Sequence, residues 1–274
     1  MSRRLMTIFG IVAAICGYLF IGENQRYFML PAAITGGLFV ITWVMQHQID
    51  WVWYQRVPPN LDESMQKLYS KTNAFYRNLT TTEKLKFGER AALYVKAKEF
   101  IGQGQEKVAE DLKFMVAFYA ALLTWNQSEY LFEEYDRIVY YLHPFLTPNH
   151  NERIHTYEVE HGDGTIILSI DELVMGFLSP GKYYQTGLHA MAEAYFACYE
   201  IKKFPGEDEN IWFDLEQISG VSREKIESHI GMKQDDPRPV IVHHFISYAE
   251  KFAEKSPALY AELVGHFGQG SIAH

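Results

Sequence analysis

The stretch KYYQTGLHAMAEAYFACYE, residues 182–200, decides the fold, and we expect it to form one α-helix. At its centre lies the turn HAMAE, residues 189–193. Side chains four residues apart share a face of a helix, so His189 and Glu193 project together. The turn therefore presents an imidazole and a carboxylate side by side, a pair able to chelate one ion.

Strand-forming segments precede this helix. Three runs are rich in β-branched and aromatic residues or alternate in polarity, namely residues 137–142, 153–160 and 165–170. The last two flank the turn HGDG and are expected to form a hairpin over residues 151–170. Residues 176–181, which contain two glycines and a proline, are expected to form a loop.

Further helices are expected on both sides of the strands. Their apolar spacing or capping signals place them at residues 62–76, 80–100, 105–125, 222–229, 240–253 and 256–267. Thr80 and Glu83 have the spacing of a capping box, and Pro257 follows Ser256 as an N1 proline follows an N-cap. The sequence thus predicts an α+β domain in which a small sheet lies between helical blocks.

Two apolar runs open the chain, residues 5–21 and 27–45, with the polar break ENQR between them. Each is close to the ~20 residues that a helix needs to cross a bilayer. A cleaved signal peptide followed by a buried helix is the alternative. The second run has full spanning length and no small-residue cleavage site precedes it, so a transmembrane helical hairpin is favoured.

Charged and aromatic residues orient this hairpin. Arg3 and Arg4 favour a cytoplasmic N-terminus, and two crossings then return the chain to the cytoplasm. Trp43, Trp51 and Trp53 lie near the second exit, as interfacial anchors do. We therefore expect a multi-pass protein of the inner, cytoplasmic membrane that contacts the lipid bilayer through residues 5–45.

The domain boundaries follow from this topology. We expect a hairpin over residues 1–49, an interfacial linker over residues 50–61 and a cytoplasmic domain over residues 62–274.

Charge and cysteine content narrow the partners. The chain from residue 50 onward carries 22 of the 25 basic and 33 of the 34 acidic residues, a formal charge of -11. Phosphate backbones attract the opposite sign, so nucleic acid is not expected as a partner. Cys16 and Cys198 suggest no disulfide framework, which fits a reducing compartment.

A third metal ligand would have to come from outside the HAMAE turn. His243 and His244 begin a predicted helix, and two imidazoles with one carboxylate make an ordinary catalytic zinc set whose fourth position holds water. The alternative is a polar pair on a helix, together with terminal histidines that have no ligand role.

The two departures from the zinc-peptidase motif H-E-x-x-H affect metal binding and catalysis differently. Ala190 stands where the motif has its general base, and Glu193 where it has the second histidine. Loss of a positioned base typically costs on the order of 10²–10⁴ in rate. Four acids are possible substitutes if they fold back towards the turn, namely Asp171, Glu172, Asp235 and Asp236.

Several stretches resemble the Mlc titration factor A family of zinc-dependent peptidases, over about residues 58–265. DRIVYYLHPF resembles the family's strand I-x-V-Y-P-x-x-F, and GTIILS resembles its strand G-x-V-x-L-S-W. HAMAE falls where the family has H-E-F-A-H. Residues 100–125, 243–252 and 256–260 are similar to the family's helix before the sheet and to its later E-F-F-A-V-x-S-E-x-F-F and P-x-L-Y segments.

The resemblance implies a zincin-like, mainly helical domain with a small sheet and zinc as cofactor. It also places His243 where the family has its third ligand, a glutamate. His189, Glu193 and His243 would then keep a set of two histidines and one glutamate with two members exchanged. Phe196 replaces the family's aspartate after the second histidine, and the membrane hairpin is an addition to a soluble family.

Three functions are consistent with these residues. The first is a membrane-anchored, catalytically impaired relative of a zinc metallopeptidase, a pseudoenzyme that binds a protein partner or belongs to a membrane complex. The second is an active metal-dependent peptidase with a rearranged centre of His189, Glu193 and His243. The third is a membrane scaffold whose cleft is filled by side chains.

Overall fold

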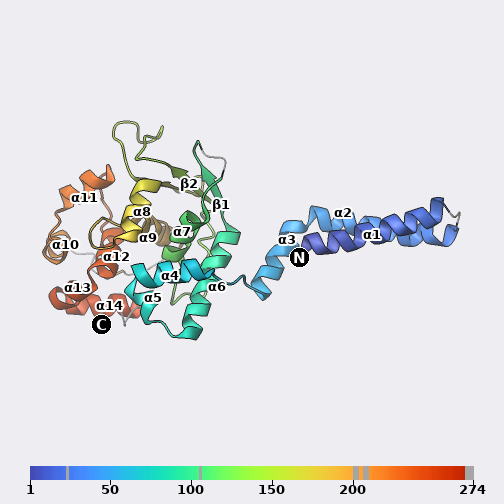
Figure 1. Cartoon of the computed structure of the whole chain (residues 1–274). Helices are drawn as coiled ribbons and strands as arrows, with labels where there is room; N and C mark the ends of the chain where they lie inside the picture. The colour runs from blue at the N-terminus through green and yellow to red at the C-terminus, as the bar shows by residue number, and fades with distance from the viewer. Residues whose placement is uncertain (23–24, 105–106, 200–203, 206–209, 269–274) are drawn as a thin grey trace. The chain divides into compact units, whose positions relative to one another are not determined.

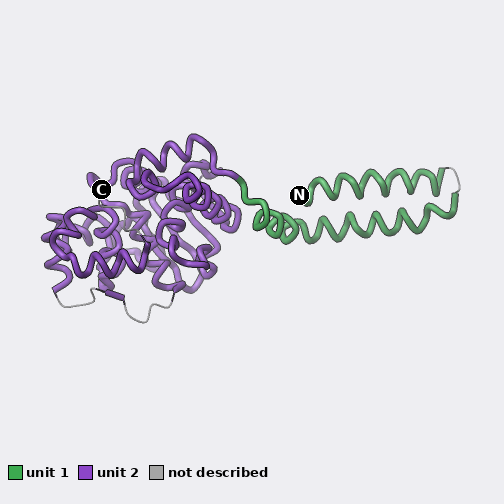
Figure 2. The backbone as a smooth tube through the Cα atoms, turned by 90° about the horizontal axis from the view of Figure 1, so that it is seen from below, with its two compact units in different colours: residues 1–59 green, residues 60–274 purple. Residues whose placement is uncertain are grey.

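The computed structural model describes residues 1–22, 25–104, 107–199, 204–205 and 210–268 of the 274-residue chain. The chain divides into two compact units, Met1–Pro59 and Asn60–His274 (Figure 2). Glu200 and Gln105, where two of the expected helices were to end and begin, lie outside the described residues.

The first unit is a pair of long helices, α1 (Ser2–Ile21) and α2 (Met29–Val44), that run side by side (Figures 1 and 2). The short 3₁₀ helix η1 (Arg26–Phe28) leads into α2. Helix α3 (Gln46–Arg56) follows, and its Asp50 carboxylate accepts hydrogen bonds from the amino group of Met1 at 2.8 Å and from the N–H of Ser2 at 2.7 Å. This contact ties α3 to the start of α1.

The two helical segments Ser2–Ile21 and Arg26–Val44 are long and apolar enough to cross a membrane, with mean hydropathies of 2.0 and 1.7. Only 6% of each apolar window is buried, whereas a helix in the core of a soluble protein would be mostly buried. A signal sequence near the N-terminus would have the same length and composition. The paired helices of the expected hairpin are present, and their insertion in a bilayer stays a prediction.

The expected linker of residues 50–61 is largely helical. Helix α3 continues to Arg56, and only the following residues are extended or irregular. Val57 precedes Pro58, whose ring disfavours helical geometry for the residue before it, and Val57 has φ -133° and ψ 77°. The proline therefore sets the end of the helix.

The second unit contains a four-stranded mixed sheet in the order β1-β2-β4-β3 (Figure 1). Its strands are β1 (Glu99–Gly102), β2 (Arg137–Tyr141), β3 (Tyr157–Glu160) and β4 (Thr165–Ser169). β1, β2 and β4 are parallel, and β3 pairs antiparallel with β4. The expected hairpin of residues 151–170 is therefore confirmed, and β3 lies at an edge of the sheet.

Helices surround this sheet. They are α4 (Glu63–Thr72), α5 (Ala74–Asn78), α6 (Thr81–Ala97), α7 (Glu110–Leu123), α8 (Ile170–Leu178), α9 (Thr186–Cys198), α10 (Ile211–Ser219), α11 (Arg223–Ile230), α12 (Arg238–Ser247), α13 (Ala249–Lys255) and α14 (Pro257–Phe267). The capping box of Thr80 and Glu83 is formed. The unit is thus mainly helical with a small sheet, as expected.

Several segments differ from the sequence-based expectation. The helix expected over residues 80–100 ends at Ala97, and the chain enters β1 instead. The helix expected over residues 62–76 is broken at Asn73, and that over residues 240–253 at Tyr248.

The loop expected over residues 176–181 begins only after α8. Gly176 lies inside that helix, where a Cβ atom would approach the carbonyl oxygen of Tyr184 to 2.6 Å. Close packing, not a turn, explains this glycine.

Helix α9 lies in the core of this unit. It packs against α7, α12 and β3, and its central residues Leu188, Ala190 and Met191 are fully buried. Because the surrounding layers cover nearly all of α9, its polar side chains can reach solvent only where a layer ends. That end lies beside the edge strand β3.

A glycine turn positions the chain that leads into β3. Gly231 ends α11 with φ 88°, and a Cβ atom there would overlap the carbonyl oxygen of Ile154. Beside this glycine, the N–H of Thr156 donates a hydrogen bond to the carbonyl of Ile230 at 2.9 Å. The end of α11 is therefore pressed against the residues that enter β3.

We expect Gly231→Ala to lower the free energy of unfolding by more than Gly220→Ala does. Gly220 ends α10 with φ 73° and would have nothing within 4 Å of an added Cβ, so its substitution costs only the left-handed backbone, ~1–2 kcal/mol. The comparison is made by denaturant unfolding of the full chain in detergent. Equal losses would show that the approach of Ile154 is unimportant.

Candidate functional site

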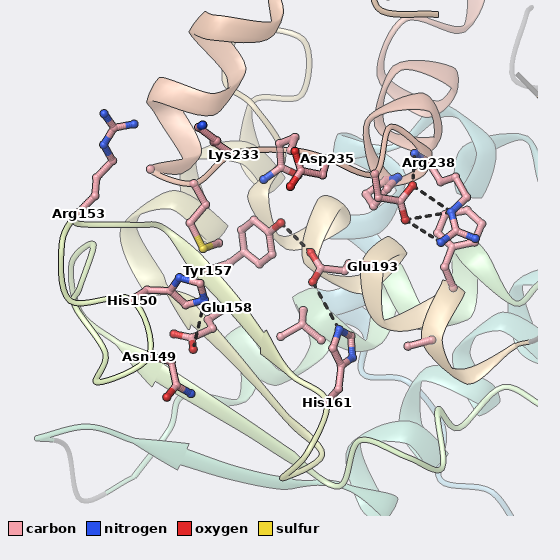
Figure 3. A pocket seen from close by; sticks show the side chains of 18 of the residues that line it. Asn149, His150, Arg153, Tyr157, Glu158, His161, Glu193, Lys233, Asp235 and Arg238 are labelled. Carbon is pink, nitrogen blue, oxygen red and sulfur yellow. Dashed lines mark hydrogen bonds and ion pairs between the residues drawn. The ribbon is translucent and has the colours of Figure 1, made fainter. Parts of the chain in front are cut away.

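A pocket of about 840 Å³ opens beside the edge strand β3 (Figure 3). Residues 149–153, strand β3, the second half of α9 and residues 231–239 supply its walls. Glu193 of α9 lines it and points towards the side chains of Tyr157 and His161 (Figure 3). The pocket therefore lies at the place where α9 meets solvent.

Glu193 is the part of the HAMAE turn that reaches this pocket, with its side chain 31% exposed. Its Oε2 accepts a hydrogen bond from the Tyr157 hydroxyl at 2.7 Å, and its Oε1 lies 4.0 Å from His161 Nε2. Burial raises the pKa of the Glu193 carboxyl to about 7, although the Tyr157 hydroxyl acts in the opposite direction. A substantial fraction of Glu193 is therefore protonated at neutral pH.

His189 is fully buried one turn earlier on the same helix. Its Nδ1 is hydrogen-bonded to the Tyr184 hydroxyl at 2.6 Å, and its Nε2 has no hydrogen-bond partner. Burial lowers the pKa of His189 to about 3, so the imidazole is neutral. The Gln234 side chain acts to raise the pKa of His189, against the effect of burial, but it forms no hydrogen bond with Nε2.

His243 is also buried, on helix α12. Its Nε2 accepts a hydrogen bond from the backbone N–H of Gln185 at 3.1 Å, and its ring stacks on Tyr184 with centroids 3.9 Å apart. Burial lowers the pKa of His243 well below its ordinary value. Because Nε2 accepts this bond, the neutral ring carries its proton on Nδ1, which has no hydrogen-bond partner and offers no lone pair to a metal ion in this tautomer.

Tyr184 contacts both imidazoles, through its hydroxyl to His189 and through its ring to His243. Throughout the described residues, no group of three or more His, Cys, Asp or Glu side chains is arranged to hold a metal ion. The side chains as they stand therefore do not fit a zinc ion. The ligand set His189, Glu193 and His243 stays a prediction.

The neighbouring histidine on α12 has a different contact. His244 Nδ1 is hydrogen-bonded to the carbonyl of Val240 at 2.8 Å, within the same helix.

The position of the missing general base is closed. Ala190 is fully buried in the hydrophobic core and does not line the pocket beside β3. Of the four acids considered as substitutes, Asp171 contacts His143 at 2.6 Å and Glu172 contacts His229 at 3.3 Å. Asp235 and Asp236 do line the pocket with Glu193. Asp236 forms an ion pair with Arg238 at 2.7 Å.

Several side chains of the site were missed by the sequence analysis. Tyr157, Glu158 and His161 belong to the predicted hairpin, but period-2 alternation does not say which face of a strand meets a helix. Tyr184 lies in a segment predicted as plain helix, although it precedes the start of α9 at Thr186. An aromatic hydroxyl beside a histidine gives no recognisable spacing signal.

A protein-family model described as glucose-regulated metallo-peptidase M90 matches residues 48–194, more than half of the chain. The match includes the strands, α9 up to Glu193 and the pocket wall formed by β3, and it ends before His243. No curated protein matches the chain. The family match suggests zinc but leaves the third ligand to be identified.

We expect Ala190→Glu to lower the free energy of unfolding by about 3 kcal/mol or more, because it buries a carboxylate without a partner. Ala261→Glu, which makes the same change on an exposed face of α14, should cost less than about 0.5 kcal/mol. Denaturant unfolding of the full chain measures both. A loss at residue 190 no larger than that at residue 261 would mean that a base can be accommodated there.

Proposed function

Because the chain belongs to the glucose-regulated metallo-peptidase M90 family, we propose that it is a membrane-anchored, catalytically impaired member that acts by binding a protein partner. The single observation that carries the proposal is Ala190. It occupies the position of the catalytic glutamate, and its surroundings are apolar and closed.

The general base is the group that a metallopeptidase cannot lose without a replacement. It takes the proton from metal-bound water, and removing a positioned base costs on the order of 10²–10⁴ in rate. Asp236 is engaged by Arg238, and Glu193 is itself a candidate ligand. Asp235, the remaining candidate at the pocket, is 95% exposed and lies 3.7 Å from Arg223. Each of the four acids considered as substitutes therefore already contacts a basic side chain.

The size and lining of the pocket support a role in binding. A volume of about 840 Å³ lies within the range of ligand-binding pockets, and its lining combines aromatic and charged side chains. A fold that retains the cleft but not the base can still bind a polypeptide without cleaving it. This is the physical basis for proposing a protein partner, alone or within a membrane complex.

The N-terminal helices support anchoring. Both are of spanning length and only 6% of each apolar window is buried, which in water would leave a large apolar surface uncovered. Arg3 and Arg4 favour a cytoplasmic N-terminus, and two crossings would then return the second unit to the cytoplasm. The proposed location is the inner membrane, with the pocket on the cytoplasmic side.

One observation favours an active enzyme as the second candidate. His189 Nε2 is a buried nitrogen without a partner, one helix turn from a carboxylate that opens to a pocket. A zinc ion held by His189, Glu193 and His243 would supply a Lewis acid and a bound water. For that set to form, Tyr184 and the hydrogen bond from Gln185 to His243 would have to rearrange.

Hydrolysis and metal content decide between these candidates. Full chain purified in detergent from zinc-replete medium should cleave neither aminopeptidase substrates nor unfolded protein at a rate that depends on His189. Cleavage abolished by His189→Ala would contradict the proposal. Elemental analysis addresses the second candidate, since zinc that is absent, or unchanged by His243→Ala, rules it out.

Cysteine labelling tests the anchor and its orientation. In a chain with Cys16→Ala and Cys198→Ala, we expect an impermeant maleimide to label Ile21→Cys in intact spheroplasts, because Ile21 ends the first span. Ala261→Cys, exposed on the second unit, should be labelled only after permeabilisation. The reverse pattern contradicts the orientation, and release of the chain by alkaline carbonate contradicts the anchor.

A further inference from the structure

The wall of the pocket carries more acidic than basic side chains. Its carboxylates are Glu152, Glu158, Glu193, Asp235 and Asp236, and its cationic side chains are Arg153, Lys233 and Arg238. Arg238 is already neutralised, because its guanidinium binds both carboxylate oxygens of Asp236 at 2.7–2.9 Å. With Glu193 partly protonated and Asp235 3.7 Å from Arg223, the wall keeps a small negative charge, and the second unit as a whole is strongly negative.

Glu193 has no cationic partner of its own. Its two contacts are the Tyr157 hydroxyl and, at 4.0 Å, the His161 ring. Within the described part of the chain, no lysine or arginine lies within ion-pair distance of it. A carboxylate accepts about four hydrogen bonds, so Glu193 retains acceptor positions on the pocket side.

Glu158 provides a second and independent observation. It follows Tyr157 on β3, and its side chain is only 3% exposed. Its Oε2 accepts from the Thr147 hydroxyl at 2.6 Å and contacts His155 Nε2 at 3.1 Å. Its Oε1 has no hydrogen-bond partner and lies 4.0 Å from His150 Nε2, at the wall of the pocket (Figure 3).

A buried carboxylate oxygen without a donor costs free energy, ~1–3 kcal/mol or more. That cost is recovered if a ligand in the pocket brings a donor. Glu193, which contacts Tyr157, and Glu158 both line this pocket. Both observations indicate a ligand that is rich in hydrogen-bond donors and positively charged.

The aromatic lining suits a long aliphatic stem that ends in a cation. Phe196 and Tyr157 line the pocket on the side of Glu193. The guanidinium of Arg238 already lies over the Phe196 ring, 4.8 Å from its centroid. Lysine and arginine bury their methylene groups against such surfaces while their charged ends seek a polar partner.

We infer that the pocket receives a lysine or arginine side chain of the partner polypeptide, whose cationic end pairs with Glu193. The inference rests on the proposed function, since it names the chemistry of the partner that the pocket binds. Glu158 accepts a further donor from the same segment. The excess negative charge of the chain after residue 50 attracts such a segment from a distance.

Peptide retention by the full chain in detergent tests this. The probes are pools of N-acetylated, C-amidated heptapeptides with randomised flanks and a fixed central residue, either Lys, Arg, norleucine or Glu, measured by equilibrium dialysis and mass spectrometry. Lys and Arg pools should be retained about tenfold more than the norleucine pool, as expected for a partly desolvated ion pair. Raising the salt concentration should reduce this ratio.

Substitutions assign the effect to Glu193. The isosteric Glu193→Gln should bring the Lys ratio to that of norleucine, whereas Glu254→Gln, on an exposed part of α13, should leave it unchanged. Asp235→Asn, at an exposed rim position, should lower it about twofold without disturbing the fold. Thermal unfolding confirms that each variant is folded.

Two results would overturn the inference. These are equal retention of the Lys and norleucine pools and a Lys preference that survives Glu193→Gln. Retention of the peptides without a preference for Lys or Arg would support partner binding but contradict the inferred basic side chain. Conversely, cleavage of the retained peptides in a manner that needs His189 would defeat the proposed function while the charge preference could still be read.

Discussion

The burial of α9 is the constraint on which the rest of the second unit depends. Its apolar residues pack into the core, so the polar side chains of the same helix have only two environments available. His189 is enclosed and neutral, and Glu193 emerges beside the edge of the sheet. The i and i+4 residues that would share a metal in a peptidase are thereby separated by environment, although they share a helix face.

Tyr184 reinforces this separation. By bonding to one imidazole and stacking on the other, it turns a potential ligand pair into part of the packed interior. The backbone N–H of Gln185 adds a hydrogen bond to His243 at the nitrogen a metal would otherwise use. Tyr184 and Gln185, the two residues before α9, therefore hold His189 and His243 in place by direct contacts.

Local sequence signals predicted the elements that are defined by residues close together in the chain. The hairpin of β3 and β4, the capping box at Thr80 and the final helix after Pro257 were predicted because turn, cap and proline signals are local. Strand β1 was missed, because its first two residues, Glu99 and Phe100, fall at the end of the expected helix, and the segment acquires strand geometry by pairing with β2. Tertiary pairing overrides local propensity in so short a segment.

The candidate site shows the same division. The turn HAMAE was found from its likeness to the motif H-E-x-x-H, and its family context from nearby motifs. The partners that decide its chemistry, Tyr157, Tyr184 and the carboxylate of Glu158, come from segments distant in sequence or from an unpatterned loop. Such contacts depend on how layers pack, which periodicity does not encode.

The clasp between Asp50 and the first two residues has a mechanical consequence for the N-terminal pair of helices. Three donors, the Met1 amino group with the N–H and hydroxyl of Ser2, converge on one carboxylate at 2.7–2.8 Å. Sliding α1 lengthwise by a single turn would carry these donors about 5 Å away and break all three bonds. These bonds thus oppose lengthwise sliding of α1 against its neighbours. They do not oppose tilting or rotation of the joined helices as one body.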